Sequence, residues 1–411
     1  MRSTEAMTTP RPASRFLDRR TPPHLATLIL FTCVAAMSMN IFLPSIPAMA
    51  VWFGAPYGTV QLSVSLYLAL SGALNLVIGP LADRYGRRPV ALWSCAGFVL
   101  ATVGVLLAPT VEVFLGFRMA QAVIATGMVL SRAAVRDTVP EAQAASMIGY
   151  LTMGMSLVPM LGPALGGWLD ESYGWQANFV VLLVLGAMVG ALIWADMGET
   201  AVLRHATLAA QMQQYPALLT SRRFWGYSVA ASASSGAFFS FLGGAPAVGA
   251  KVFGLTPSEL GLYFSFPGIG YLLGNFASAR VAARRGVVRM VRDGSVVIVA
   301  ALVMMILLTS AGVSHPLVFF GLMGAVGIGN GLTMPSANAG MMSVRPELAG
   351  SASGLGGALM IGGGAALSAV AAAVTGAYDS PLPLMVLMLA SGLVGLIAIF
   401  TVQARNRRLG L

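Results

Sequence analysis

Long apolar runs recur along this chain, and they constrain its fold more than any other feature. Each is long enough to cross the ~30 Å hydrocarbon layer of a bilayer. The runs predict twelve membrane spans, at 24–49, 59–80, 90–109, 111–132, 145–168, 176–196, 224–247, 258–279, 293–313, 316–342, 349–377 and 382–403. Backbone polar groups in lipid must be satisfied within their own segment, so only helices fit such runs. The predicted fold class is an all-α membrane protein.

Basic residues predict how the spans are oriented. With these spans, 22 of the 24 lysines and arginines fall on one side of the membrane, and the loops on the other side contain only Lys251. The positive-inside rule then places both termini in the cytoplasm, which requires an even number of spans. The remaining basic residue, Arg118, lies inside a span.

Several other classes of protein fit this sequence poorly. The net charge of +10 would favour nucleic-acid binding, but the arginines are divided among separate loops instead of forming one stripe. Cys33 and Cys95 both lie in spans, so neither a disulfide framework nor a metal site is expected, and no cofactor is implied. The first run resembles a signal peptide ending at 48–50. That run is longer than a typical h-region of ~7–15 residues, and its removal would leave eleven spans.

The longest polar connection divides the chain near its middle. It predicts a cytoplasmic tail (1–23), a six-helix bundle (24–196), a cytoplasmic linker (197–223), a second six-helix bundle (224–403) and a final tail (404–411). The second half repeats part of the first, because Gly274 ends its span as Gly79 does, 195 residues earlier, and an arginine cluster with Gly286 follows. Parallel repeats of this kind place a substrate site between the two halves.

The loop 79–89, GPLADRYGRRP, joins two spans and is interpreted as a cytoplasmic gate. Its glycines allow a tight turn and close helix approach. Asp83 can lie at a helix N-terminus or pair with Arg132 or Arg136. A basic turn that served only topology would need neither Asp83 nor the glycines. The proposed gate residues are Gly79, Asp83, Arg84, Gly86, Arg87, Arg88, Arg132 and Arg136.

Three motifs resemble those of the major facilitator superfamily, over a region from about Leu25 to Val402. The loop 79–89 matches the pattern G-x-L-a-D-r-x-G-r-r, and residues 117–122 resemble the R-x-x-q-G motif with Ala122 in place of glycine. Gly149 and the segment 162–167 resemble the antiporter motif of drug exporters, while 40–47 and 132–137 resemble the bicyclomycin and chloramphenicol resistance (Bcr/CflA) branch. The resemblance implies two pseudo-symmetric six-helix bundles in a bacterial inner membrane. It also implies a monomer that exports small drugs in exchange for protons.

Span 5 contains a predicted hinge formed by Gly162, Pro163, Gly166 and Gly167. Small residues let a partner helix approach closely, and proline interrupts the helical hydrogen-bond ladder. The alternative is that these glycines serve packing alone.

Arg118 is the strongest candidate for a site residue, because a guanidinium inside a span costs at least ~2.5 kcal/mol and needs a polar partner or cavity. At ~1.5 Å per residue, Arg118, Asn40 and Tyr67 all lie roughly 10–13 Å below the outer boundary. Gln121 lies on nearly the same helical face as Arg118. These four residues form the predicted polar part of a substrate site. Alternatively, Arg118 snorkels to the outer surface as an anchor.

The apolar part of the predicted substrate site comes from spans 5, 7 and 8. Its candidates are Met155, Phe238, Phe241, Tyr263 and Phe266. Aromatic residues at such positions also serve as packing or lipid-facing residues, and that alternative stays open.

The chain departs from its resembling exporters at Asn40. The resemblance implies an aspartate there that takes part in proton coupling, and an amide cannot exchange a proton near neutral pH. All fourteen acidic residues fall in loops or at span ends. An anionic or acceptor-rich substrate is therefore expected, and an exporter or facilitator without proton coupling is the leading alternative.

His24, His205 and His315 also lie at span ends or in loops, so an enzyme is not expected. A sensor without transport activity is a remote alternative, since no soluble signalling domain is appended.

Overall fold

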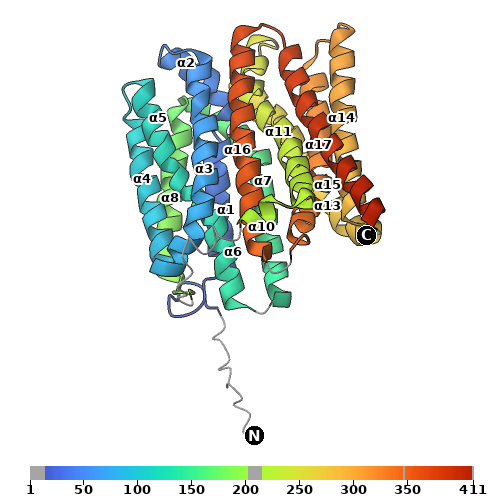
Figure 1. Ribbon diagram of the computed structural model, residues 1–411. Helices are drawn as coiled ribbons and strands as arrows, with labels where there is room; N and C mark the ends of the chain where they lie inside the picture. The colour runs from blue at the N-terminus through green and yellow to red at the C-terminus, as the bar shows by residue number, and fades with distance from the viewer. Residues whose placement is uncertain (1–13, 140, 202–214, 346–347, 410–411) are drawn as a thin grey trace, which may run out of the picture.

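The computed structural model describes residues 14–139, 141–201, 215–345 and 348–409, which are helical with no strand among them. The predicted all-α fold class is confirmed. Figure 1 shows long helices standing side by side, with residue 14, where the described chain begins, and the end of α17 at the same end of the molecule. The predicted terminal tails and linker fall partly on 1–13, 202–214 and 410–411, outside the described residues.

The first half of the chain contains helices α1 to α8. Their bounds are α1 (Leu25–Asn40), η1 (Leu43–Ser45), α2 (Ile46–Trp52), α3 (Tyr57–Tyr85), α4 (Arg87–Leu106), α5 (Val111–Ala120), η2 (Gln121–Ala125), α6 (Thr126–Thr138), α7 (Glu141–Tyr173) and α8 (Gln176–Asp196). The first span is broken after Asn40, where Pro44 has no backbone N–H to donate to the Asn40 carbonyl.

The second half contains helices α10 to α17. Their bounds are α10 (Tyr215–Leu219), α11 (Arg222–Lys251), α12 (Pro257–Tyr263), α13 (Ser265–Arg285), α14 (Val287–Ser310), η3 (Leu317–Gly321), α15 (Leu322–Met342), α16 (Ala349–Ala377) and α17 (Leu382–Leu409). The segment η3 is one turn of π-helix at the start of the tenth predicted span.

Ten helical segments in the described chain are long and apolar enough to cross a membrane by length and composition. Helix α11 and the pair α12–α13 occupy the other two predicted spans. Most side chains of α11 are buried inside the protein, so this helix does not need the apolar surface of a lipid-facing span. Several helices extend beyond the predicted spans. For example, α7 runs to Tyr173 and therefore includes Asp170.

One glycine separates two helices at the same place in each half. Gly86, with φ 97°, joins α3 to α4, and Gly286, with φ 80°, joins α13 to α14. Only glycine adopts such a positive φ readily. The two turns are 200 residues apart, so the 195-residue register based on Gly79 and Gly274 is wrong. Turn geometry, and not the position of a span-end glycine, sets the register of the repeat.

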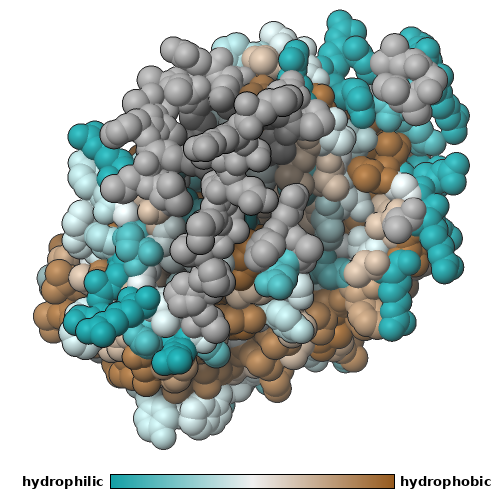
Figure 2. Space-filling view, turned by 90° about the horizontal axis from the view of Figure 1, so that it is seen from below, coloured by the Kyte–Doolittle hydropathy of each residue, from teal (hydrophilic) through white to brown (hydrophobic). Residues whose placement is uncertain are grey.

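Both turns lie at what we call the arginine-rich end, where α3, α13 and α17 finish and α4, α11 and α14 begin. Seen from that end, hydrophilic residues gather toward the margins of the face and apolar residues flank its side (Figure 2). We call the other end, where α3 begins, the opposite end.

Residues 14–24 form an N-terminal strap that packs against the end of α8. Asp196 is fully buried and accepts hydrogen bonds from the backbone N–H groups of Leu17 (2.7 Å) and His24 (2.8 Å). Gly198 lies against the carbonyl oxygens of Arg19 and Thr21, where a Cβ atom would be too close. This part of the predicted tail is therefore an ordered piece of the fold.

Candidate functional site

Arg118 lies on α5 inside the first half, with none of its surface exposed. One guanidinium nitrogen, Nη1, donates to the Ser38 hydroxyl (3.2 Å) and to Gln121 Oε1 (2.8 Å). The other, Nη2, donates to the Ser38 carbonyl (2.7 Å). Arg118 therefore does not snorkel to the surface, because its charge is satisfied by α1 and by its own span.

Two aromatic rings lie against the same guanidinium. Arg118 Cζ is 4.1 Å from the ring centroid of Tyr67 on α3 and 4.5 Å from that of Phe42. A cation held against ring faces in a desolvated site gains about 2 kcal/mol. The predicted meeting of Arg118, Tyr67 and Gln121 is thus seen in the structure, and it joins three spans.

The network continues from Gln121 to α4. Gln121 Nε2 donates to the Thr102 hydroxyl (2.7 Å), which in turn donates to the Phe98 carbonyl (2.6 Å). Ser38 and Thr102 were not anticipated from the sequence, since hydroxyl residues inside apolar runs carry no spacing signal. We call Ser38, Tyr67, Thr102, Arg118 and Gln121 the Arg118 network.

Asn40 is not one of the residues that contact Arg118. Its amide nitrogen donates to the Ala36 carbonyl one turn earlier (2.8 Å), and its side chain is buried. The contacts with Arg118 that were expected of Asn40 are made instead by Ser38, two residues before it, and by Phe42, two residues after it. Similar depth in the membrane did not place Asn40 on the same side of its helix.

The aromatic candidates form a separate ring cluster in the second half. Phe241 is fully buried, with the ring centroids of Phe264, Phe319 and Phe320 at 4.9, 5.8 and 5.8 Å. Phe238, Tyr263 and Phe266 extend this cluster. In this conformation Phe241 is a packing residue, whereas Phe266 is 36% exposed and Met155, on α7, is half-buried. Phe319 and Phe320 were missed because the π-turn that presents them has no simple sequence pattern.

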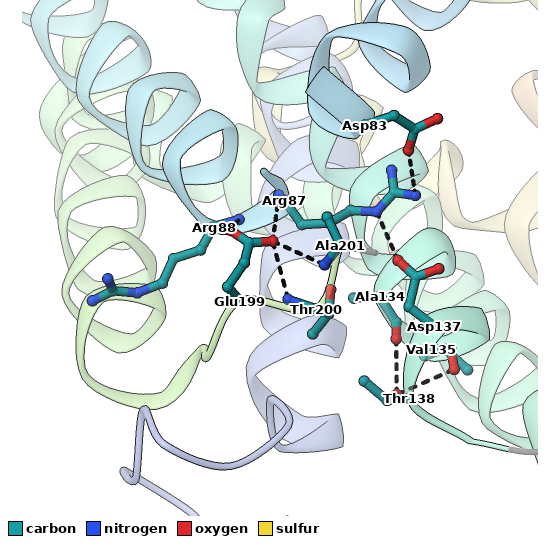
Figure 3. Close-up of polar contacts among 10 residues, drawn as sticks. All are labelled: Asp83, Arg87, Arg88, Ala134, Val135, Asp137, Thr138, Glu199, Thr200 and Ala201. Atoms are coloured by element: carbon teal, nitrogen blue, oxygen red, sulfur yellow. Dashed lines mark hydrogen bonds and ion pairs between the residues drawn. The ribbon is translucent and has the colours of Figure 1, made fainter. Parts of the chain in front are cut away.

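Two of the proposed gate residues, Asp83 and Arg87, form ion pairs inside the first half (Figure 3). Arg87 at the start of α4 contacts Asp83 on α3 (2.7 Å) and Asp137 on α6 (2.8 Å). Asp83 was expected to pair with Arg132 or Arg136. The turn at Gly86 instead brings Arg87 back toward α3, so that one guanidinium lies between two carboxylates from different spans.

Glu199, which follows α8, binds the same turn. Its carboxylate accepts from the backbone N–H groups of Arg87 (2.8 Å) and Arg88 (3.2 Å) (Figure 3). These are free donors in the first turn of α4, where the helix dipole also favours a negative charge. A Cβ on Gly86 would collide with this carboxylate. Glu199 carries no signal of this role in the sequence, because it lies in the predicted linker.

Replacing Glu199 with alanine should lower the free energy of unfolding by about 1 kcal/mol, the usual effect of losing a helix cap. Thermal unfolding of the purified protein would measure this. Glu199→Gln keeps one acceptor oxygen and should lose less. Equal stability of Glu199→Ala and the parent would show that the carboxylate does not hold this turn.

The two halves are joined by hydrogen bonds toward the opposite end. Tyr57 donates from its hydroxyl to the Gly243 carbonyl (3.1 Å), and Gln61 Nε2 donates to the Leu242 carbonyl (3.3 Å). These bonds connect α3 to α11. Ser265 on α13 donates to the Met160 carbonyl on α7 (2.8 Å). We call these contacts the opposite-end seal.

Two of the predicted hinge residues, Gly166 and Gly167, lie where α7 meets other segments of the protein. Gly166 lies against the Ile41 carbonyl, at the break in the first span, and Gly167 lies against the Pro257 carbonyl at the start of α12. A Cβ at either position would overlap the facing carbonyl oxygen. Adjacent glycines therefore let α7 touch the first half on one side and the second half on the other.

Comparison with known proteins agrees with this architecture. Residues 28–369 match the family Major Facilitator Superfamily. The chain belongs to this superfamily. Superfamily members are transporters, so the protein is a multi-pass membrane transporter and not an enzyme, as the sequence predicts.

Curated relatives within the superfamily include drug-resistance proteins. A "Chloramphenicol resistance protein" of Pseudomonas aeruginosa is 33% identical over 309 residues, which is 74% of this chain and 73% of that protein. "Multidrug transporter MdfA" of Yersinia pestis bv. Antiqua (strain Angola) is 30% identical over 69% of this chain and 70% of its own length. These matches support membership of the drug-transporting branch of the superfamily.

A solved structure shares the fold. It is a bacterial homologue of the human lysosomal transporter Spinster, in an inward-facing and occupied conformation. The TM-score is 0.71 at 17% identity, over 93% of this chain and 96% of the other. At this identity the match shows the fold alone.

Proposed function

We propose that this protein exports small, amphiphilic, drug-like molecules of the chloramphenicol or bicyclomycin type from the cytoplasm across the bacterial inner membrane. The two drug-resistance relatives support the substrate class, and the arginine-rich loops support a cytoplasmic location for the arginine-rich end. We further propose that it works as a monomer.

The transport cycle we propose is alternating access between two six-helix bundles, 24–196 and 224–403. The opposite-end seal carries this proposal, because hydrogen bonds between α3 and α11, together with the close contact of Gly167 with Pro257, join the two halves at that end. Interfaces of this kind can separate as rigid bodies. With this seal closed, the substrate path would open toward the cytoplasm at the arginine-rich end, where the Asp83–Arg87–Asp137 group holds α3, α4 and α6 of the first half together.

The contacts of Arg118 argue against a free anion as the preferred substrate. Its guanidinium is already covered by Ser38, Gln121 and two rings, so little of its charge remains for a ligand. We propose that the Arg118 network sets the shape and polarity of the site wall. Neutral, acceptor-rich molecules such as chloramphenicol fit that role better than strong anions.

Because residue 40 is an asparagine, proton coupling would need a carboxyl group elsewhere in the protein. We propose Asp170 for that role. It lies on α7 near the opposite end with 8% of its surface exposed, and its Oδ2 atom has no hydrogen-bond partner among the described residues. The Asn178 Oδ1 and Trp175 Nε1 atoms nearby in the chain are also buried without partners there. A carboxyl that gains and loses a proton could satisfy such groups in turn. Transport without protons, favoured by Asn40, is the second candidate function.

Purified protein in proteoliposomes tests both candidates. Uptake of labelled chloramphenicol should follow an imposed pH gradient in the native protein, lose that response in Asp170→Asn, and keep it in Asp379→Asn, an exposed control. Chloramphenicol transport that ignores the gradient in all three proteins would select the uncoupled facilitator. In that case, Asn40→Asp should introduce proton dependence. The export function itself would be contradicted if the native protein transported none of a panel of neutral, cationic and anionic drugs.

A further inference from the structure

A basic pocket of about 660 Å³ lies at the arginine-rich end of the second half. It is bounded by the end of α13, the first turns of α14 and the last turns of α17, which pack together. Its basic lining residues are Arg285, Arg289, Arg292 and Arg407. The gate and the Arg118 network belong to the first half, so this pocket is a separate feature.

The pocket carries more positive charge than its own acid can balance. Asp293 is the acidic lining residue, and it pairs with Arg285 (3.2 Å) and Arg292 (2.7 Å). Arg289 and Arg407 make no ion pair or hydrogen bond with any described residue and are both exposed. Four arginines and one carboxylate leave a net charge of +3 around the cavity. This favours a ligand with at least one negative charge.

Two side-chain amides in the same pocket lack partners. The buried Gln403 Oε1 and Asn406 Oδ1 atoms make no hydrogen bond with the described residues. Buried polar atoms are normally paired, and an unpaired one calls for a missing partner. An amide can offer either its oxygen or its nitrogen, so each can meet a phosphate oxygen or a hydroxyl or ammonium donor. The pocket therefore suits a phosphate group that is attached to a polar alcohol or amine.

The surroundings of the pocket distinguish a lipid from a free phosphate. Helices α14 and α17 lie at the edge of the molecule, where hydrophilic residues gather in the end-on view (right in Figures 1 and 2). On α17 the exposed residues Leu393 and Phe400 precede Arg407 by fourteen and seven residues, so the three side chains lie on one face of the helix. One face of the helix thus passes from apolar to basic at the expected membrane boundary. A phosphate in the pocket could have its acyl chains on that apolar face.

We propose that this pocket binds the phosphate headgroup of an anionic phospholipid such as phosphatidylglycerol. Basic pockets between membrane helices on the cytoplasmic side are suited to such headgroups. Arg289 and Arg407 contact the phosphate, while Gln403 and Asn406 bind the alcohol of the headgroup. Bound there, the lipid holds α17 against α14.

The full-length protein provides a direct test. Native mass spectrometry would compare retention of phosphatidylglycerol and phosphatidylcholine, and added inorganic phosphate would compete in a separate arm. We expect the Arg289→Ala/Arg407→Ala double variant to weaken phosphatidylglycerol binding by roughly thirtyfold. Arg405→Ala, an exposed arginine on α17 that does not line the pocket, should bind like the parent.

Each outcome decides the proposal. Selective phosphatidylglycerol retention that is lost only in the double variant supports it, and higher salt should weaken that retention. Displacement by millimolar inorganic phosphate would instead identify a soluble-anion site and overturn the lipid proposal. Equal retention of both lipids, or equal loss in Arg405→Ala, would also overturn it. Because the replaced side chains are exposed, circular dichroism should report unchanged helix content in every variant.

Discussion

Arg118→Ala is expected to abolish measurable drug transport and to lower the free energy of unfolding by about 3 kcal/mol, the scale of losing charged hydrogen bonds in a buried site. The change removes three hydrogen bonds and two ring contacts that join α1, α3 and α5. It also leaves Gln121 Oε1 buried without its donor. Transport in proteoliposomes and thermal unfolding would measure the two effects.

Two control variants separate charge from geometry. Arg118→Lys keeps the charge but cannot reach Ser38 and Gln121 with one planar group, so it should recover stability only in part. Arg280 also lies against a ring, with Cζ 4.1 Å from the Phe276 centroid, but it is exposed. Arg280→Ala should therefore leave both transport and stability close to the parent. A fully active Arg118→Ala protein would show that the network is dispensable.

Gly167→Val is expected to stop transport by a different route, because it prevents closure of the opposite end. A side chain there overlaps the Pro257 carbonyl, so α7 and α12 could no longer touch. The protein should still fold in the state that is open at the opposite end. A single cysteine at position 258, on a background without Cys33 and Cys95, should then react faster with a membrane-impermeant maleimide.

A matched glycine on the same helix provides the control. A Cβ atom on Gly149, which is also on α7, would have no neighbouring atom of the described chain within 4 Å. Gly149→Val should therefore transport and label like the parent. If Gly167→Val transported normally, or its cysteine labelled no faster, the contact between α7 and α12 would not be part of the cycle.

The sequence could predict the fold because the bilayer imposes one solution on long apolar runs. The hydropathy of a span is a weaker signal where the span is buried inside the protein. Helix α11 is an example, because it is rich in serine and glycine and is less apolar than a lipid-facing span. Helix ends were predicted less well. Asp83 and Asp170 look like loop residues in the sequence, yet α3 continues to Tyr85 and α7 continues to Tyr173, beyond both aspartates.

The candidate site could be predicted only where a polar or charged residue interrupts an apolar span. Arg118 is a charge inside an apolar run, and its partners Tyr67 and Gln121 followed from depth and helical spacing. The rotation of each helix about its axis does not follow from depth, so Asn40 was placed beside Arg118 when Ser38 is the neighbour. Glu199 was missed because its partners, two backbone N–H groups, exist only after the Gly86 turn has formed.

The N-terminal strap sets an order on biosynthesis. Leu17 and His24 are made before their acceptor Asp196, which follows more than 170 residues later at the end of α8. The strap can dock only when all helices of the first half have been inserted. Docking of the strap therefore ties the start of α1 to the end of α8, and it requires the whole of the first half to have been made.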